Sequence, residues 1–239
     1  IYKDKLYVVD FENILYCYSI KDGNKIWSFK SENVFIKSPK KLSIAISENI
    51  IYFNNSVGDI NALNAINGKL IWQLPTQNNQ IYEDSFLLKS SDLVATKKSI
   101  IFSNNRNQFY SIDKKTGILN WEQKINSSLN PIVVDELIFT VSLEGFLLII
   151  NRISGDIIRI TDVFNIFKEK KRSDITPIGF IVGNKKIYLT TNNGRLLIID
   201  IKTGKTIRMV KIDGNQISKP IIENKKLHII KDNMIVRFD

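Results

Sequence analysis

Residues 194–208 read GRLLIIDIKTGKTIR, and the pattern in these fifteen residues indicates the architecture of the chain. The apolar run from Leu196 to Ile199 is rich in β-branched side chains, which favour a strand. Asp200 follows the run, and Gly204 comes four residues later. An Asp side chain can hydrogen-bond the backbone of a tight turn while the glycine adopts a positive φ. The stretch therefore predicts a strand, a tight hairpin turn and a second strand.

The same pattern occurs five times along the chain, at intervals of 38 to 49 residues. Each copy has a Ser, Asn or Asp that is followed four residues later by a glycine. The pairs are Ser19 with Gly23, Asn64 with Gly68, Asp113 with Gly117, Asn151 with Gly155, and Asp200 with Gly204. Self-similarity at such a period is typical of repeat architectures. The sequence thus predicts five equivalent hairpins.

Two further columns of residues recur in register with these glycines. Ten residues before each glycine lies a residue type that tolerates the left-handed region, namely Asn13, Gly58, Asn107, Gly145 and Gly194. Four residues after each glycine lies Trp27, Trp72, Trp121, Arg159 or Arg208. We expect each Trp to dock on a neighbouring sheet through its buried ring and its indole N–H. The arginines are expected to be unable to dock in the same way, although their stems can cover part of the same surface.

The apolar runs between these columns predict short strands. Runs upstream of the first turn cover residues 6–9, 50–53, 100–102, 137–141 and 187–189, and Pro-led runs at residues 131–134, 177–180 and 220–222 predict a fourth, innermost strand. Four short strands per repeat, without a helical period, predict an all-β fold, a β-propeller of four-stranded antiparallel blades.

Counting strands gives roughly 22, or about five and a half blades, in a single domain. We expect the blades to span roughly residues 1–30, 38–75, 84–125, 129–163, 175–212 and 217–239. A ring cannot close on half a blade, so we expect further blades upstream of this sequence.

Composition restricts the function further. The net charge of +10 makes anionic partners candidates. Hydrophobic residues make up 44% of the chain and charged residues 24%, a balance that excludes collagen-like, coiled-coil and disordered chains. Cys17 is the single cysteine and His228 the single histidine, which excludes disulfide frameworks and Cys/His zinc sites. Both lie in strand columns, so we expect Cys17 to be a small packed side chain and His228 to be a strand residue rather than a general base. No apolar run approaches the roughly 20 residues of a membrane-spanning helix. We expect neither a metal nor a cofactor.

The Asx, Gly and Trp spacing resembles the pyrroloquinoline-quinone-like repeat, and the whole chain resembles the BamB family of outer-membrane protein assembly factors. The order of loops between Trp27 and Trp72 and the ending from Lys226 to Asp239 carry the likeness. It implies an eight-bladed ring, with roughly two and a half blades upstream of Ile1 and an N-terminal segment that completes the last blade. It also implies a non-catalytic lipoprotein on the periplasmic face of the outer membrane of a Gram-negative bacterium, with a lipid anchor outside this chain.

The resemblance implies binding to the periplasmic domains of the barrel-forming subunit BamA and assistance to unfolded outer-membrane protein clients. BamB proteins dock through a loop that reads apolar, any, apolar, basic. The partner-binding candidates that match this order are Val34, Phe35, Ile36 and Lys37. Apolar residues beside a cation provide a desolvated anchor and an orienting charge. In the alternative interpretation, Val34 and Ile36 only cap the hydrophobic edge of a blade.

Two other stretches bear on partners. A second family docking loop carries two acidic residues, and the corresponding residues 88–92 keep one, Asp92, which weakens that match. The longest inter-blade insertion carries Lys168-Glu169-Lys170-Lys171-Arg172. It is interpreted either as a solvated loop or short helix, or as a contact for an acidic partner or anionic lipid through Lys168, Lys170, Lys171 and Arg172.

Three rival functions are weighed against the scaffold. A quinone-dependent dehydrogenase needs a calcium ion held by carboxylate and amide oxygens and a catalytic carboxylate. Asp113 and Asp200 are assigned to turns, and no compact acidic cluster remains in the sequence. For nucleic-acid binding, the sequence offers basic charge but neither the aromatic-basic motif of a known module nor a helix that could enter a groove. We therefore expect no binding to nucleic acid. An interaction propeller for another envelope partner remains the third alternative.

Overall fold

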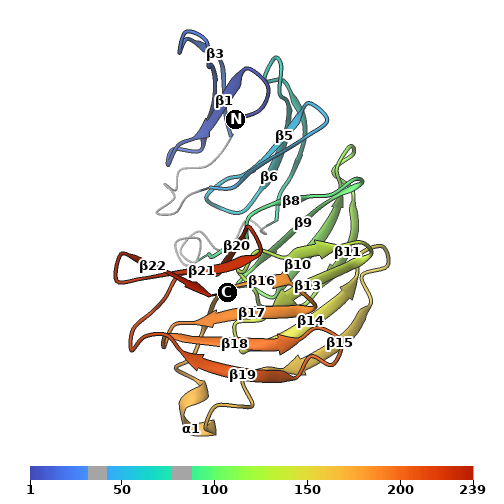
Figure 1. Cartoon of the computed structure of the whole chain (residues 1–239). Coiled ribbons are helices and arrows are strands. Elements are labelled where there is room, and N and C mark those ends of the chain that lie inside the picture. Colours follow the sequence, from blue (N-terminus) through green and yellow to red (C-terminus); the bar gives the residue numbers. More distant parts are fainter. Residues whose placement is uncertain (32–41, 77–87, 239) are drawn as a thin grey trace. The chain divides into compact units, whose positions relative to one another are not determined.

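The computed structural model of this chain describes residues 1–31, 42–76 and 88–238. Within these ranges the chain forms 22 strands in six sheets and one short helix, α1 (Glu169–Arg172). The sheets hold three, four, four, four, four and three strands, and within each sheet the strands lie side by side in their sequence order (Figure 1). The predicted all-β fold of four-stranded antiparallel blades is confirmed.

The contacts divide the chain into two compact units, residues 1–102 with 110–122 and residues 103–109 with 123–239. The first three sheets comprise β1 (Lys5–Val9), β2 (Ile14–Ser19) and β3 (Lys25–Lys30); β4 (Ile44–Ser47), β5 (Ile50–Asn54), β6 (Ile60–Asn64) and β7 (Leu70–Leu74); and β8 (Val94–Ala95), β9 (Ser99–Asn104), β10 (Gln108–Asp113) and β11 (Leu119–Gln123). The last three comprise β12 (Ile132–Val134), β13 (Leu137–Val141), β14 (Phe146–Asn151) and β15 (Ile157–Asp162); β16 (Pro177–Gly183), β17 (Lys186–Thr191), β18 (Arg195–Asp200) and β19 (Thr206–Lys211); and β20 (Ile221–Glu223), β21 (Lys226–Lys231) and β22 (Met234–Phe238).

The hairpin turns follow the repeat columns. The five glycines have φ values between +71° and +80°, and each glycine N–H donates to the carbonyl oxygen four residues earlier at 2.8 or 2.9 Å. The side chains of Asp113 and Asp200 also accept backbone N–H groups of the turn, from Thr116 at 2.9 Å and from Thr203 at 2.7 Å. These backbone donors hold the pKa of both carboxyl groups below the ordinary value.

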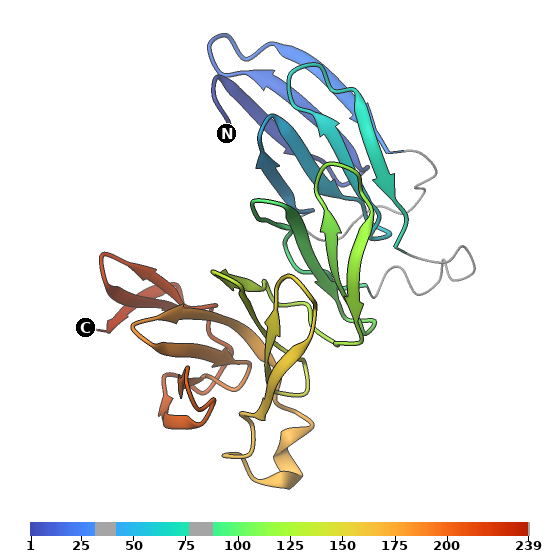
Figure 2. The ribbon, with the colours of Figure 1, turned by 90° about the vertical axis from the view of Figure 1, so that its right-hand side faces the viewer.

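Neighbouring sheets bury apolar faces against each other within each unit. Sheets β1–β3 and β4–β7 lie face to face (Figure 2), and their shared core includes Leu15, Cys17 and Phe53. Strand β5 is buried on both faces, because Ile51 and Phe53 join this core while Tyr52 packs toward the third sheet. Central strands buried in this way explain why their sequences read as continuous apolar runs.

In the first unit, a Trp from one sheet docks on the glycine turn of the next. Nε1 of Trp27 donates to the carbonyl oxygen of Ile66 at 3.1 Å, and a Cβ added to Gly68 would lie 2.6 Å from the indole ring. Trp72 repeats the arrangement on the following turn, where Nε1 donates to the carbonyl oxygen of Lys114 at 3.1 Å. The glycine is required here for close approach as well as for its backbone conformation.

A tyrosine accompanies each of these two rings. The Tyr7 hydroxyl donates to the carbonyl oxygen of Ala65 at 2.8 Å, and the Tyr52 hydroxyl donates to that of Lys114 at 3.0 Å. Their ring centroids lie 5.8 and 5.9 Å from those of Trp27 and Trp72. Burial raises the pKa of both tyrosines above the ordinary value. Each turn is therefore held by two donors from the preceding sheet.

Arg159 corrects an expectation drawn from the sequence. In the second unit its guanidinium occupies the Trp column and donates to two carbonyl oxygens of the next turn, from Nη1 to Lys202 and from Nη2 to Ile201, the latter at 2.6 Å. Trp rings and this arginine thus bind the same backbone positions of their target turns. The sequence-based expectation gave the arginines only their stems as a covering surface and overlooked the guanidinium donors, which match the carbonyl groups that a turn leaves exposed.

A register shift precedes the Trp or Arg of this column in four sheets. The pairing of the last two strands skips one residue between Cys17 and Tyr18, and at the equivalent places in three later sheets. In each case the extra residue is an exposed isoleucine, namely Ile26, Ile71, Ile158 and Ile207. A β-bulge of this kind re-aims the next side chain. Here the next residue is the docking Trp or its arginine replacement.

Candidate functional site

The four residues predicted to bind a partner lie outside the residues that the structure describes; they are Val34, Phe35, Ile36 and Lys37. The structure does describe both ends of the segment that carries them. We call residues 31–43 the first connection, because they link β3 of the first sheet to β4 of the second. The described ends of this segment are Ser31 and residues 42–43.

Both ends of the first connection are buried and hydrogen-bonded. Ser31 is 2% exposed; its N–H donates to the carbonyl oxygen of Asn13 at 3.3 Å, and its Oγ accepts from Nδ2 of Asn55 at 3.1 Å. Ser43 is 6% exposed, and its N–H donates to Oδ1 of Asn54 at 2.8 Å. Two consecutive asparagines at the end of β5 thus hold the start and the end of this connection.

The second connection, residues 76–93, links β7 to β8. At its start, the N–H of the buried Thr76 donates to Oδ1 of Asp59 at 3.2 Å. At its end, the N–H of the buried Leu93 donates to Oγ of Ser43 at 2.8 Å. Within residues 88–92 the one acidic side chain, Asp92, is exposed. The end of the second connection is therefore bonded directly to the end of the first.

The basic insertion between β15 and β16 is a folded element. Phe164 is 1% exposed and packs edge-on against Phe167, with ring centroids 5.5 Å apart. Arg172 Nη1 lies 3.1 Å from Oδ2 of Asp162, and Nη2 donates to the carbonyl oxygen of Asn165 at 3.0 Å. The Arg172 guanidinium therefore makes its bonds within the insertion and its flanking strand. The exposed cations at its tip are Lys168, Lys170 and Lys171.

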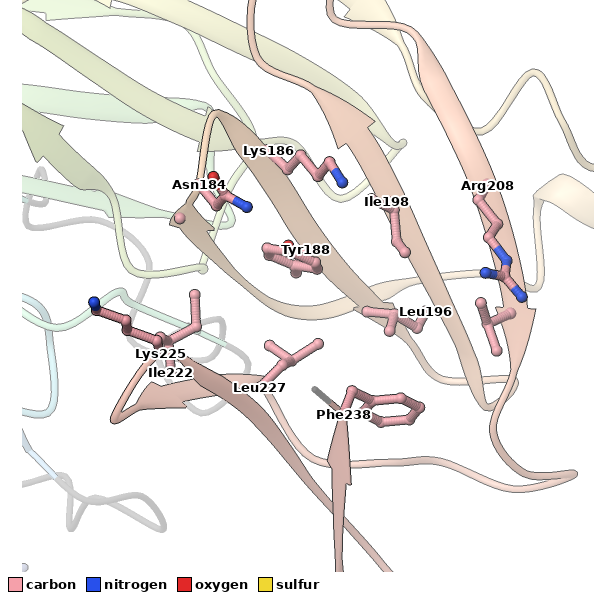
Figure 3. Close-up of a pocket in the computed structure, with 12 residues that line it drawn as sticks. Asn184, Lys186, Tyr188, Leu196, Ile198, Arg208, Ile222, Lys225, Leu227 and Phe238 are labelled. Carbon is pink, nitrogen blue, oxygen red and sulfur yellow. The ribbon is translucent and has the colours of Figure 1, made fainter.

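A groove of about 720 Å³ opens between the sheets β16–β19 and β20–β22 of the second unit. Figure 3 shows Tyr188 and Leu196 from the fifth sheet facing Leu227 and Phe238 from the sixth, with the Arg208 guanidinium at one end. Tyr188 stands in the column of Tyr7 and Tyr52, and Arg208 in the column of the docking Trp residues. In the first unit, residues of these two columns hold the glycine turn of the following sheet. In the fifth sheet, the same columns line the groove instead.

The two chemically distinctive side chains lie in strands. Cys17 is free and fully buried in β2, and burial raises the pKa of its thiol. His228 lies in β21, opposite Ile221 and Arg237 in the flanking strands. Across the described ranges, no group of three or more His, Cys, Asp and Glu side chains is arranged to hold a metal ion. The same ranges contain no helix with the length and apolar character to cross a membrane.

Consecutive meander sheets, with glycine turns at Gly68, Gly117 and Gly204 that side chains of the preceding sheet contact, define a repeat β-propeller. The family model described as outer membrane protein assembly factor BamB matches residues 1–161. The chain belongs to the BamB family.

Individual relatives are distant. The outer membrane protein assembly factor BamB of Yersinia pestis is 22% identical over 215 residues, which cover 84% of this chain and 50% of that protein. The protein of the same name from Legionella pneumophila (strain Paris) is 24% identical over 154 residues, 63% of this chain and 35% of its own length. The chain thus spans half or less of the length of these curated relatives.

Solved structures show the same fold. The crystal structure of BamB from Moraxella catarrhalis matches with a TM-score of 0.78 and 15% identity, over 99% of this chain and 70% of that one. A chain in the crystal structure of the Mitotic Checkpoint Complex matches with a TM-score of 0.70 and 12% identity, over 97% of this chain and 69% of that one. At these identities the likeness establishes the propeller fold alone.

Proposed function

We propose that this chain is a non-catalytic scaffold of the outer-membrane β-barrel assembly machinery, at the periplasmic face of the outer membrane. In this role it binds the periplasmic domains of BamA and assists the delivery and insertion of outer-membrane proteins, while a lipid anchor holds the lipoprotein at the membrane. Support comes from membership of the BamB family and from two relatives whose names describe outer membrane protein assembly factors.

The observation that carries the proposal is the way in which the first connection is mounted. Its sequence contains the apolar and basic residues Val34, Ile36 and Lys37. Its ends, Ser31 and Ser43, are buried and bonded to side chains of the second sheet. A binding loop on a rigid scaffold loses less conformational freedom when its partner docks. Fixed ends of this kind support a docking role for the segment between them.

The proposal is tested by the affinity for the purified periplasmic domains of BamA. The wild-type chain is expected to bind, and the double variant Ile36→Glu, Lys37→Glu to bind at least about tenfold more weakly, because it loses an apolar anchor and reverses a charge. Lys69→Glu, a charge reversal at an exposed strand-flanking site, is the control and should leave binding unchanged. Equal binding by the double variant would reject the loop, and no binding by the wild type would reject the function.

The non-catalytic assignment has its own test. Pyrroloquinoline quinone with Ca²⁺ should keep its absorbance spectrum when the chain is added, because the aspartates of the hairpin turns, such as Asp113 and Asp200, bond backbone N–H groups. A stoichiometric, calcium-dependent shift of the quinone spectrum would support the dehydrogenase-like alternative instead.

The tip of the basic insertion is proposed as a second contact, for an acidic partner or anionic lipid. Lys168, Lys170 and Lys171 are exposed beside each other, whereas Arg172 pairs with Asp162. Replacing the three lysines by glutamate should weaken binding to vesicles that contain anionic lipid or to an acidic partner surface. Unchanged binding to both would leave the insertion with a structural role only.

A further inference from the structure

Lysines gather at the hairpin turns of the fifth and sixth sheets. They lie in or directly beside the β16–β17 turn, the glycine turn between β18 and β19, and the β20–β21 turn. We call them the lysine face, which consists of Lys185, Lys186, Lys202, Lys205 and Lys225. Lys186 is half-buried and the other four are exposed. All five belong to the second unit.

Contacts between the turns bring these lysines to one surface. The N–H of Ile201, in the glycine turn, donates to the carbonyl oxygen of Lys185 at 3.2 Å. A Cβ added to Gly183, directly before the β16–β17 turn, would lie 2.5 Å from Cδ1 of Ile222 in the sixth sheet. Figure 3 shows Lys225 beside the same turn. The three turns therefore form one continuous surface.

The positive charge of the lysine face is largely uncompensated. Within the described ranges, none of the five lysines forms an ion pair. The same turns carry two carboxylates: Glu223 is exposed, and Asp200 accepts the N–H and the hydroxyl of Thr203 at 2.7 and 2.9 Å. The equivalent turn of the fourth sheet consists instead of Asp135 and Glu136. The excess of lysine is therefore local to the fifth and sixth sheets.

The backbone of two of these turns does not favour lysine. Asn184 and Lys185 have φ values of +46° and +57°, and Asn224 and Lys225 have values of +48° and +63°. Two-residue hairpin turns with a positive φ at both positions favour Asn-Gly, because a Cβ is strained in the left-handed region. The corresponding turn of the second sheet has Asn49 at the second position, with a φ of +63°. Lysine is thus present twice where local structure favours glycine or asparagine, and strain of this kind points to a function.

The lysine face and the tip of the basic insertion lie at opposite ends of β16. The insertion ends where β16 starts, at Pro177, and β16 ends at Gly183, directly before the turn that contains Lys185. Seven strand residues span about 20 Å. A flat bilayer that faces one of these two basic surfaces is therefore turned away from the other.

We propose that the lysine face binds the anionic headgroups of a lipid bilayer. Its side chains come from three turns, so the charge is spread over a surface rather than focused on one small ligand. Basic clusters of this size are attracted to anionic bilayers. Of the two partners proposed for the insertion tip, this arrangement leaves the acidic partner. The position at the outer membrane rests on the proposed function, whereas binding to anionic vesicles can be measured without it.

The proposal is tested by sedimentation with vesicles of phosphatidylcholine, either alone or mixed with phosphatidylglycerol. The wild-type chain should bind the mixed vesicles at least about tenfold more tightly than the neutral ones, and less tightly at high salt. Lys185→Gly with Lys225→Gly should weaken this binding at least about fivefold. The thermal midpoint should not fall in this double variant, because glycine adopts the turn conformation without strain. Loss of binding is then separated from loss of structure.

Three further variants complete the test. Lys202→Gln with Lys205→Gln removes two charges of the lysine face outside the strained positions and should also weaken vesicle binding. Lys170→Gln with Lys171→Gln removes the same charge from the insertion tip and should leave vesicle binding unchanged. Asn49→Gly makes a comparable backbone change in the second sheet, and it should leave vesicle binding unchanged too.

Several outcomes would overturn the proposal. These are equal binding to neutral and anionic vesicles, binding like the wild type in both lysine-face variants, and an equal loss in the variant of the insertion tip. Binding to polyglutamate without binding to the anionic vesicles would assign the lysine face to an acidic polypeptide and would reject the lipid. If the wild type binds anionic vesicles but not the BamA periplasmic domains, the proposed function fails while the lysine face stands.

Discussion

Gly68 illustrates at the residue scale how the repeat uses its glycines. Its φ is +71°, and a Cβ would lie 2.6 Å from the Trp27 ring. Gly23 has a φ of +72° but no heavy atom within 4 Å of such a Cβ. The two positions therefore separate the cost of the backbone conformation from the cost of the close contact.

We expect Gly23→Ala to lower the free energy of unfolding by about 1–2 kcal/mol, which is the cost of a left-handed alanine. Gly68→Ala should lower it by about 1–3 kcal/mol more, because the Trp27 ring must move away. Urea unfolding monitored by Trp fluorescence measures both values. Equal effects of the two substitutions would show that the Trp27 contact contributes nothing to stability.

Arg159 and Arg208 provide a second matched pair at this scale. Arg159 bonds carbonyl oxygens of the next turn, whereas Arg208 is exposed at the end of the groove. Arg159→Ala should destabilise the chain by about 1.5–3 kcal/mol, since two carbonyl oxygens of the turn, one of them part-buried, lose their charged donor. Arg208→Ala should stay within about 0.5 kcal/mol of the wild type. Thermal unfolding of both variants measures their stabilities. A larger loss of stability in Arg208→Ala than in Arg159→Ala would contradict the docking role of Arg159.

At the scale of the element, the basic insertion separates structural from exposed cations. Arg172 bonds Asp162 and backbone carbonyl groups, whereas Lys171 is exposed one residue earlier. Arg172→Glu should destabilise the chain by about 1–3 kcal/mol, because it loses these bonds and places two carboxylates together. Lys171→Glu should change stability by less than about 0.5 kcal/mol. The denaturant midpoints of the two variants measure the difference. Equal midpoints would mean that the Arg172 bonds contribute nothing to the free energy of unfolding.

The elements themselves were largely predictable from the sequence, because turn residues at fixed spacing mark where each strand starts and ends. The six sheets follow those columns. The docking of Arg159 was not predictable, since the carbonyl groups it binds are visible only once the next turn is placed. The bond between Asn55 and Ser31 was hidden for a related reason. The sequence position of Asn55 is equivalent to that of Asn104, and only the fold brings Ser31 within reach of one of them.

At the scale of the whole molecule, buried tyrosines link stability to alkaline pH. Burial raises the pKa of Tyr7 and Tyr52, and that of Tyr110 to about 12. An unfolded Tyr ionises near pH 10, so the unfolded chain releases protons that the folded chain keeps. The contribution of these groups is therefore complete below about pH 10 and is lost as the pH rises toward the folded pKa values.

We expect the urea midpoint to fall between about pH 9.5 and 11.5, and to fall less steeply in the Tyr7→Phe, Tyr52→Phe variant, which lacks two of the ionising groups. Parallel urea titrations across this range measure the two slopes. The double variant should also start from a lower midpoint at pH 8, because two carbonyl groups lose a donor. Equal slopes would show that these two tyrosines do not carry the alkaline transition.

The sequential order of the strands has a consequence for how the chain acquires its structure. Within each sheet the strands pair with their neighbours in sequence, so each sheet can form from about 20 to 40 consecutive residues without waiting for a distant segment. A low separation between partners shortens the search for native contacts and limits the time that unpaired edges are exposed to other chains. For a chain that emerges from one end, a meander of this kind allows the early sheets to be complete before the late ones exist.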